Sequence, residues 1–136
     1  MALQEAQQAF EEDEVPIGAV VVCNQRVIGR GHNMVERLND ATAHAEMIAL
    51  TAASDFLGNK FLKQCTLYVT IEPCPMCAGA LKWAQIGRVV YGTREPKTGY
   101  SLHSPSLLHP KTQVTRGVME YECSALMQDF FRKKRS

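Results

Sequence analysis

Two short segments, residues 42–46 (TAHAE) and 73–77 (PCPMC), put metal-ligating side chains at the predicted starts of two helices. Cysteines three residues apart on a helix share one face, so the thiolates of Cys74 and Cys77 can reach one ion. The partial positive charge at a helix N-terminus favours thiolate over thiol, and therefore favours metal binding. With His44 as the third ligand, we predict a metal site whose fourth position is left for water.

Hydrophobic periodicity predicts the elements around these segments. The first predicted helix ends before Val15, and three more are predicted over residues 43–57, 78–86 and 120–133. Strands are predicted over residues 17–22, 26–28, 66–71, 88–91 and 114–119. Thr42 is expected to cap the second helix. This order of elements predicts an α/β fold, a three-layer α/β/α sandwich with a central mixed five-stranded sheet. A length of 136 residues suits a single domain over 1–136.

The pattern also predicts which side chains are buried. The expected buried stripe of the second helix is Met47, Ile48, Leu50 and Ala53, and that of the last helix is Cys123, Leu126, Met127 and Phe130. Cys23, Cys65 and Cys123 are expected to be buried free thiols, because only Cys74 and Cys77 are closely spaced. Residues 96–110 form the longest irregular segment, which we interpret as a lid or substrate wall. Glu72 is expected to be structural and to steady the turn into the helix that carries Cys77, and His32, His103 and His109 are expected to be solvated loop residues.

The net charge and the hydropathy of the sequence indicate which partners and which cell compartment to expect. The net charge of +1 means that any nucleic-acid binding must come from a local patch, such as the basic residues 132–135. No apolar run approaches the roughly 20 residues needed to span a bilayer. The acidic, amphipathic start of the chain is unlike a signal peptide. We therefore expect a cytoplasmic protein without a membrane partner.

Glu46 lies two residues after His44 in the sequence and could transfer protons at the predicted metal site. Bound zinc lowers the pKa of its water from about 16 to about 7, and a nearby carboxylate can take the released proton. Glu46 can then pass this proton to a ring nitrogen of the substrate and later to a departing amine, which leaves as ammonia. On a regular helix, however, residues 44 and 46 point to different sides, unless both lie in the first turn. A closed structural zinc site and a redox dithiol at Cys74 and Cys77 are the alternatives.

Taken together, the motifs resemble the bacterial tRNA-specific adenosine deaminases, within the cytidine-deaminase-like superfamily. The resemblance is carried by residues 14–20 (EVPIGAV), 42–46, 67–80 (LYVTIEPCPMCAGA), 87–92 (GRVVYG), 97–99 (KTG) and 130–132 (FFR). It implies hydrolytic deamination of the wobble adenosine in a tRNA anticodon loop to inosine, with the target base splayed out of its stack. It also implies one Zn²⁺ per subunit, Glu46 as the catalytic residue and a homodimer that contacts the anticodon stem-loop.

The resemblance extends to residues that contact the substrate. Asn33 matches an asparagine of the substrate pocket, and Phe130 and Arg132 match the C-terminal helix beside the anticodon loop. Glu95 stands where the family often has aspartate, and the loop from 100 to 110 is shorter than in close relatives. Two other functions stay open: deamination of a free small molecule such as guanine, and a non-catalytic RNA-binding subunit with structural zinc. The basic C-terminal helix argues against the first, and Glu46 argues against the second.

Overall fold

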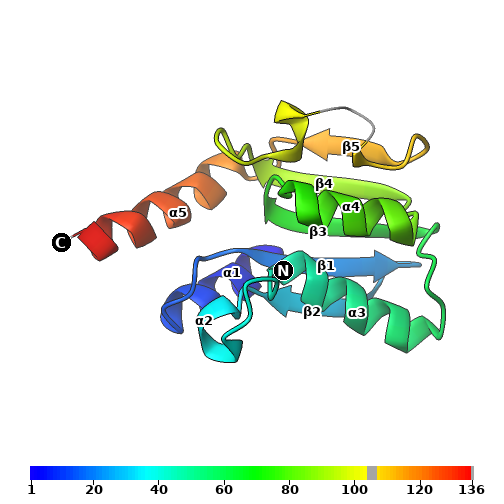
Figure 1. Cartoon of the computed structure of the whole chain (residues 1–136), viewed down its shortest axis with the longest axis horizontal. Coiled ribbons are helices and arrows are strands. Elements are labelled where there is room, and N and C mark those ends of the chain that lie inside the picture. The colour runs from blue at the N-terminus through cyan, green and yellow to red at the C-terminus, as the bar shows by residue number, and fades with distance from the viewer. Residues whose placement is uncertain (104–106, 136) are drawn as a thin grey trace.

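The computed structural model describes residues 1–103 and 107–135. In these residues five strands form one sheet with the order β2-β1-β3-β4-β5 (Figure 1). The strands are β1 (Gly18–Cys23), β2 (Arg26–His32), β3 (Cys65–Ile71), β4 (Arg88–Thr93) and β5 (Gln113–Arg116). β1 runs antiparallel to β2 and β3, whereas β3, β4 and β5 are parallel. The predicted mixed five-stranded sheet is confirmed.

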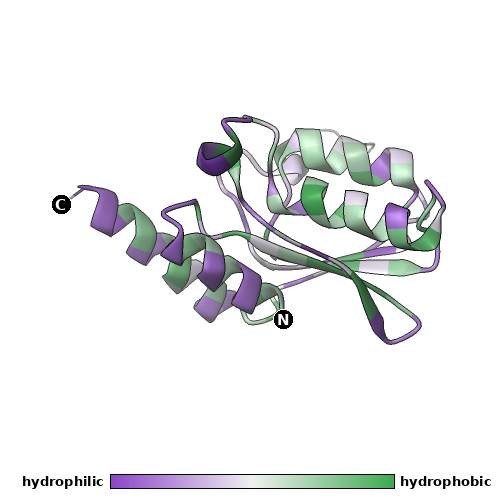
Figure 2. Cartoon of the chain, turned by 90° about the horizontal axis from the view of Figure 1, so that it is seen from below, coloured by the Kyte–Doolittle hydropathy of each residue, from purple (hydrophilic) through white to green (hydrophobic). Residues whose placement is uncertain are grey.

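Helices cover both faces of the sheet. α3 (Ala45–Leu57) and α4 (Pro75–Ala84) lie on one face, and α1 (Ala2–Glu11) and α5 (Glu120–Arg135) lie on the other (Figure 2). α5 extends beyond the sheet toward the C-terminus (Figure 1). The one-turn helix α2 (Val35–Leu38) and the 3₁₀ turn η1 (Tyr100–Leu102) lie in connections. These layers confirm the predicted α/β/α sandwich, and no helix among the described residues has the length and apolar character to cross a bilayer.

Two glycines let α3 lie directly on the sheet edge. A Cβ atom on Gly29 would be 2.4 Å from the carbonyl oxygen of Ala49, and one on Gly31 would be 2.4 Å from that of Ala45. Any side chain at either position would therefore push α3 away from β2. The start of α3 is held beside the end of β2 as a result. The start of α4 follows the carboxyl end of β3, and the two helix starts meet there.

Element boundaries differ from the predictions where local conformation decides them. α3 begins at Ala45, two residues later than predicted, with His44 as its N-cap residue. Thr42 does not cap it, because its hydroxyl and its N–H both donate to Asp40. β5 ends at Arg116, since Gly117 and Met119 have φ angles of 83° and 52° in the left-handed region. A four-residue helix such as α2 leaves no periodic pattern, and it was not predicted.

Burial also departs from the predicted stripes. Leu50 and Ala53 are buried as expected, but Met47 and Ile48 are only half-buried, and Ala45 and Ala49 face the sheet instead. In α5, Cys123 and Phe130 are buried, whereas Leu126 and Met127 are half-buried. Small alanines replace larger residues against β2 because the helix lies so close to the strand. Cys65 is buried and Cys23 half-buried, both as free thiols.

The long segment after β4 is anchored where it is described. Residues 104–106 of this segment lie outside the described residues. Tyr100 is buried and packs edge-on against Tyr91, and Leu108 is buried in the core. Two backbone amides of the segment, those of Glu95 and Ser101, donate to the buried carboxylate of Glu72. Glu72 is therefore structural, as predicted, although it steadies this loop rather than the turn into α4.

Candidate metal centre and active site

The starts of α3 and α4 bring three potential ligands together. His44 is the N-cap residue of α3, Cys74 is the N-cap residue of α4, and Cys77 lies in the first turn of α4. The Nδ1 atom of His44 is 3.7 Å from the Sγ atom of Cys74 and 3.6 Å from that of Cys77. All three ligand atoms lie within 4.8 Å of one another. Ligands of a tetrahedral Cys₂His zinc site are separated by about 3.5–3.8 Å, so this cluster can hold a metal ion.

The charges of the cluster also suit a cation. A hydrogen bond from the Cys77 thiol lowers the pKa of the Cys74 thiol to about 4, and His44 acts in the same direction. The same bond, together with burial, raises the pKa of Cys77. The hydrogen bond to Cys74 raises the pKa of His44. A cation at this position displaces the proton that the two sulfurs share, because both cysteines ligate as thiolates.

Glu46 is buried beside the cluster with one oxygen unsatisfied. Its side chain is 2% exposed, and its Oε1 atom has no hydrogen-bond partner among the described residues. Burial raises the pKa of Glu46 to about 7. A buried polar atom without a partner is rare in a folded protein. An open carboxylate oxygen next to three ligands gives the site a group that can exchange a proton with a bound molecule.

The backbone of His44 removes the objection that residues 44 and 46 point apart. His44 has extended angles, φ −78° and ψ 152°, and lies outside the regular turns of α3. Glu46 is the second residue of the helix. The angular spacing of a regular helix therefore does not apply between them. The side chain of His44 can reach Cys74 and Cys77 while Glu46 is buried close by.

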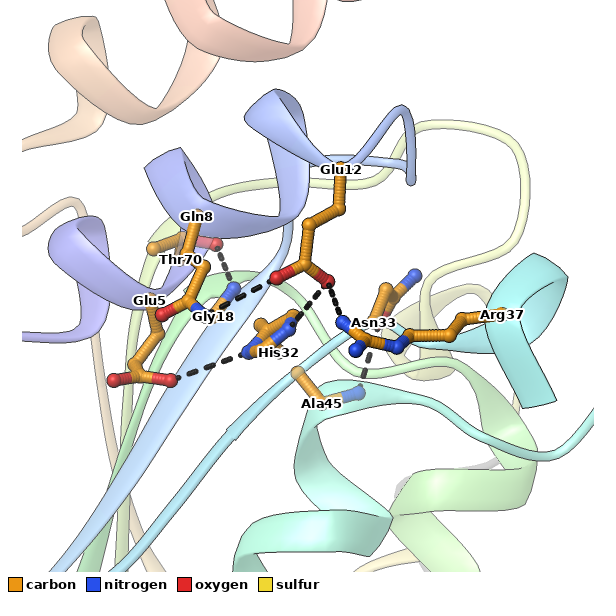
Figure 3. A network of polar contacts seen from close by, with 9 residues as sticks. All are labelled: Glu5, Gln8, Glu12, Gly18, His32, Asn33, Arg37, Ala45 and Thr70. Atoms are coloured by element: carbon orange, nitrogen blue, oxygen red, sulfur yellow. Dashed lines mark hydrogen bonds and ion pairs between the residues drawn. The ribbon is translucent and has the colours of Figure 1, made fainter.

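Asn33, just after β2, holds the start of α3. Its Oδ1 atom accepts the backbone N–H of Ala45 at 2.8 Å (Figure 3). This bond replaces the predicted cap by Thr42, and it comes from a residue twelve positions earlier in the chain. Asn33 is 5% exposed. It therefore fixes the helix end next to the ligand His44, in addition to lining the pocket described below.

A pocket of about 1030 Å³ opens beside the cluster. It is lined by residues of the α1–β1 connection, α2 and α5 as well as Asn33 and His44: Glu12, Asp13, Glu14, Val15, Ile17, Val35, Glu36, Arg37, Ala41, Phe130 and Lys134. Three segments that are distant in the sequence thus form one wall around the histidine ligand. The described parts of residues 96–110 are not among the residues that line this pocket, and their role as a lid or substrate wall stays a prediction.

The other predicted contact residues are dispersed. Phe130 borders the pocket but is buried against Phe10, with ring centroids 6.0 Å apart. Glu95 lies outside the pocket lining, where its carboxylate accepts the N–H of Lys97. Arg132 is exposed and pairs with Asp129 at 3.2 Å. The structure therefore brings Asn33 and Phe130 to the pocket and leaves Glu95 and Arg132 away from it, and their contacts with RNA stay predictions.

Sequence reasoning missed several residues near the site. His32 is not a solvated loop residue: it ends β2 between the carboxylates of Glu5 and Glu12, at 3.4 and 3.1 Å (Figure 3). Glu12 also pairs with Arg37 of α2 at 3.3 Å. Lys134 lines the pocket and pairs with Asp13. None of these pairings has a fixed sequence spacing, so no local pattern could have predicted them.

The fold and the cluster define a class of protein, the MafB19-like deaminases, whose family model matches residues 1–135. A tRNA-specific adenosine deaminase of Streptococcus pyogenes serotype M18 is 43% identical over 98% of this chain and 87% of that protein. A solved structure from studies of A-to-I editing by tRNA:A34 deaminases has 44% identity and a TM-score of 0.86, covering 92% of this chain and 94% of that one. The chain belongs to the family of tRNA-specific adenosine deaminases.

One further structural likeness bears on the free-base alternative. A guanine deaminase from Nitrosomonas europaea has a TM-score of 0.84 at 24% identity, covering 95% of this chain and 80% of that one. At this level of identity the likeness extends to the fold alone. One fold thus accommodates different amine-bearing rings, and the pocket determines which ring is accepted.

Proposed function

We propose that this chain is a zinc-dependent hydrolytic deaminase that converts the wobble adenosine in a tRNA anticodon loop to inosine and releases ammonia. The observation that carries this proposal is the unpartnered carboxylate oxygen of Glu46 beside the His44, Cys74 and Cys77 cluster. The identity to tRNA-specific adenosine deaminases supports the choice of substrate. Residues 1–136 would form a single deaminase domain acting in the cytoplasm, where tRNA is found.

In this proposal His44, Cys74 and Cys77 would hold one zinc ion, which would lower the pKa of a water molecule to about 7 when bound. Glu46 accepts the proton of this water on its open carboxylate oxygen. It delivers the proton to a ring nitrogen of adenine as the new C–O bond forms at C6. Glu46 then takes the remaining proton from the hydroxyl at C6 and passes it to the amine, and the C–N bond breaks as the C6 carbonyl forms and ammonia leaves. The reaction consumes one water and requires no redox cofactor.

The shape of the pocket supports a nucleotide within a loop over a free base. The pocket is about 1030 Å³ in volume, and its charged lining consists of four carboxylates, on Glu12, Asp13, Glu14 and Glu36, and two cations, Arg37 and Lys134, each paired with one of them. A free-base enzyme needs an enclosed pocket around the ring. A single-stranded loop can insert one base at low unstacking cost, with its phosphates held outside this acidic lining. Of the basic residues of α5, Lys134 lines this pocket, where it suits a phosphate contact, and Phe130 borders it with its ring packed on Phe10.

The substrate proposal is tested by mass spectrometry of nucleosides after incubation of the zinc-loaded protein with either tRNA or free guanine. We expect inosine to form in a tRNA that carries a wobble adenosine. A tRNA with guanosine at that position is the matched control and should be unchanged. Xanthine from guanine, with the tRNA untouched, would instead assign the chain to free-base deamination. Absence of both products from zinc-loaded protein would favour the non-catalytic alternative.

The outer face of α4 supports the proposed homodimer. Trp83 is 83% exposed and Met76, two turns earlier on the helix, is 37% exposed. A tryptophan that is solvated to this extent is unusual unless a partner covers it, since aromatic residues are enriched at interfaces. The buried side of α4 carries the ligand Cys77. A second copy docked on this helix would therefore lie near the metal site.

Trp83→Glu should shift the protein from dimer to monomer. Removing a central interface tryptophan costs about 2 kcal/mol or more, which raises the dimer dissociation constant at least about 30-fold. The measurement is sedimentation equilibrium over a concentration series. Tyr121→Glu is the matched control, because Tyr121 is 81% exposed on the other layer of the sandwich. A wild-type monomer, or an equal shift in both variants, would contradict the interface on α4.

A further inference from the structure

Three glutamate side chains are buried among the described residues, namely Glu14, Glu46 and Glu72, each 2% exposed. Glu46 has an oxygen without a partner, as a group that reacts with a bound molecule requires. The other two differ from it, because each accepts two backbone N–H groups. Glu72 thereby holds the segment 95–101. Glu14 has no part in the chemistry described above, and its contacts point toward the pocket.

Glu14 holds the one-turn helix α2. Its Oε1 atom accepts the N–H of Glu36 at 3.1 Å, and its Oε2 atom accepts the N–H of Arg37 at 2.8 Å. Glu12, two residues earlier, pairs with the Arg37 guanidinium at 3.3 Å and with His32 (Figure 3). Two carboxylates from the α1–β1 connection therefore bind the same short helix. The backbone amides at the start of α2 in turn compensate for the burial of the Glu14 charge.

α2 has little else to hold it in place. It is four residues long and has no buried side chain, and its apolar residue Leu38 is 54% exposed. A helix of one turn is unstable alone, since nucleation fixes several backbone angles for a single hydrogen bond. Its last turn ends at Asn39 in the left-handed conformation. Polar contacts, and above all those of Glu14, set the position of α2.

The position of α2 matters because the helix forms a pocket wall. Val35, Glu36 and Arg37 line the same pocket as Asn33 and His44. A nucleotide held in this pocket beside His44 would contact α2. In contrast, α2 contributes neither a ligand nor the proton-transferring carboxylate. A loosened α2 would therefore change how well a loop is held more than how fast a bound base reacts.

We propose that Glu14 is a positioning residue that fixes α2 as a wall of the substrate pocket and so sets the affinity for the RNA loop. The inference rests on the proposed function for the identity of the ligand. Glu14→Gln is the informative substitution, because glutamine keeps the shape but places an NH₂ group against one of the two backbone donors. The loss of one accepted bond in a buried setting corresponds to about a tenfold weaker hold on α2.

The test combines affinity, turnover and local exchange. Fluorescence anisotropy gives Kd for an anticodon stem-loop, single-turnover assays at saturating RNA give the rate of inosine formation, and hydrogen–deuterium exchange reports on residues 34–43. For Glu14→Gln we expect Kd to rise about tenfold, with a rate within about twofold of wild type, full metal content and faster exchange in this segment. Glu11→Gln, an exposed residue at the end of α1, is the charge-matched control and should change none of these values.

Glu12→Gln is a second variant that tests the proposal if the Glu14→Gln protein does not fold. Glu12 is partly exposed, so its substitution should leave the fold intact and raise Kd in the same direction by a smaller factor. Unchanged Kd and exchange in both folded variants would overturn the proposal, as would a fall in the saturating rate with unchanged Kd. If wild-type protein binds the stem-loop but forms no inosine, the proposed function fails while the affinity ratio still tests Glu14. Absence of RNA binding by wild type would overturn both.

Discussion

Glu46→Gln protein should keep its metal and form inosine about 10³–10⁴ times more slowly than wild type. Glutamine has the shape of glutamate but cannot accept the proton of the attacking water or return it to the leaving amine. The side chain is buried, so solvent buffer cannot replace it. The neutral amide also avoids the cost of burying a charge, which raises the pKa of Glu46 to about 7. We therefore expect the fold to be unharmed.

The rate is measured under single-turnover conditions, and the metal content by elemental analysis of the same sample. Glu11→Gln loses the same charge at an exposed position and should react at the wild-type rate. A loss of less than tenfold, with metal retained, would show that Glu46 does not transfer the proton. Loss of metal from the Glu46→Gln protein would instead assign Glu46 a role in holding the ion.

Cys77→Ser should abolish both metal binding and activity. Cys77 is fully buried at the start of α4, and a serine hydroxyl is a poor replacement for a thiolate ligand. The bound zinc should fall from about one ion per chain to nearly none, and inosine formation below detection. Because metal binding is coupled to folding, the Tm should fall as well. Cys23→Ser, a half-buried thiol on β1, is the control that should retain metal.

A chelator shows whether the lower Tm of the Cys77→Ser protein comes from loss of the metal or from altered packing of the side chain. A chelator should lower the Tm of wild-type protein toward that of Cys77→Ser and should leave the Tm of Cys77→Ser unchanged. If the chelator lowers the Tm of both proteins equally, the ion is bound elsewhere. If it lowers neither, while zinc is present, the cluster contributes nothing to stability and the proposed coordination is wrong.

The parts of the site that depend on local spacing were predictable from the sequence. Cys74 and Cys77 lie three residues apart at a helix start, and the geometry of a helix places their side chains on one face whatever the rest of the fold. The five strands and four longer helices were also predictable, since each has a hydrophobic period of its own. Only their ends were misplaced, at positions such as Met119 where a left-handed residue interrupts the pattern.

The parts that depend on distant contacts were not predictable. The cap of α3 comes from Asn33 rather than from the neighbouring Thr42, because the end of β2 lies beside the helix start. The role of Glu14 depends on α2, which is too short to have a period. The side chain of His32 lies between the carboxylates of Glu5 on α1 and Glu12 just after it, a contact that depends on how α1 packs beside β2. Each of these contacts is set by the tertiary fold and has no fixed spacing along the chain.

The bond from Ala45 to Asn33 bears on how long the metal ligand stays in place. The first amides of a helix ordinarily have no partner in the helix, and this end unravels and exchanges with solvent most readily. In this chain the end that would unravel is the one that carries His44 and Glu46. The amide of Ala45 is tied to the residue that follows β2, so the first turn of α3 cannot open without also breaking this contact. The bond therefore opposes fraying at the helix end that carries the metal ligand.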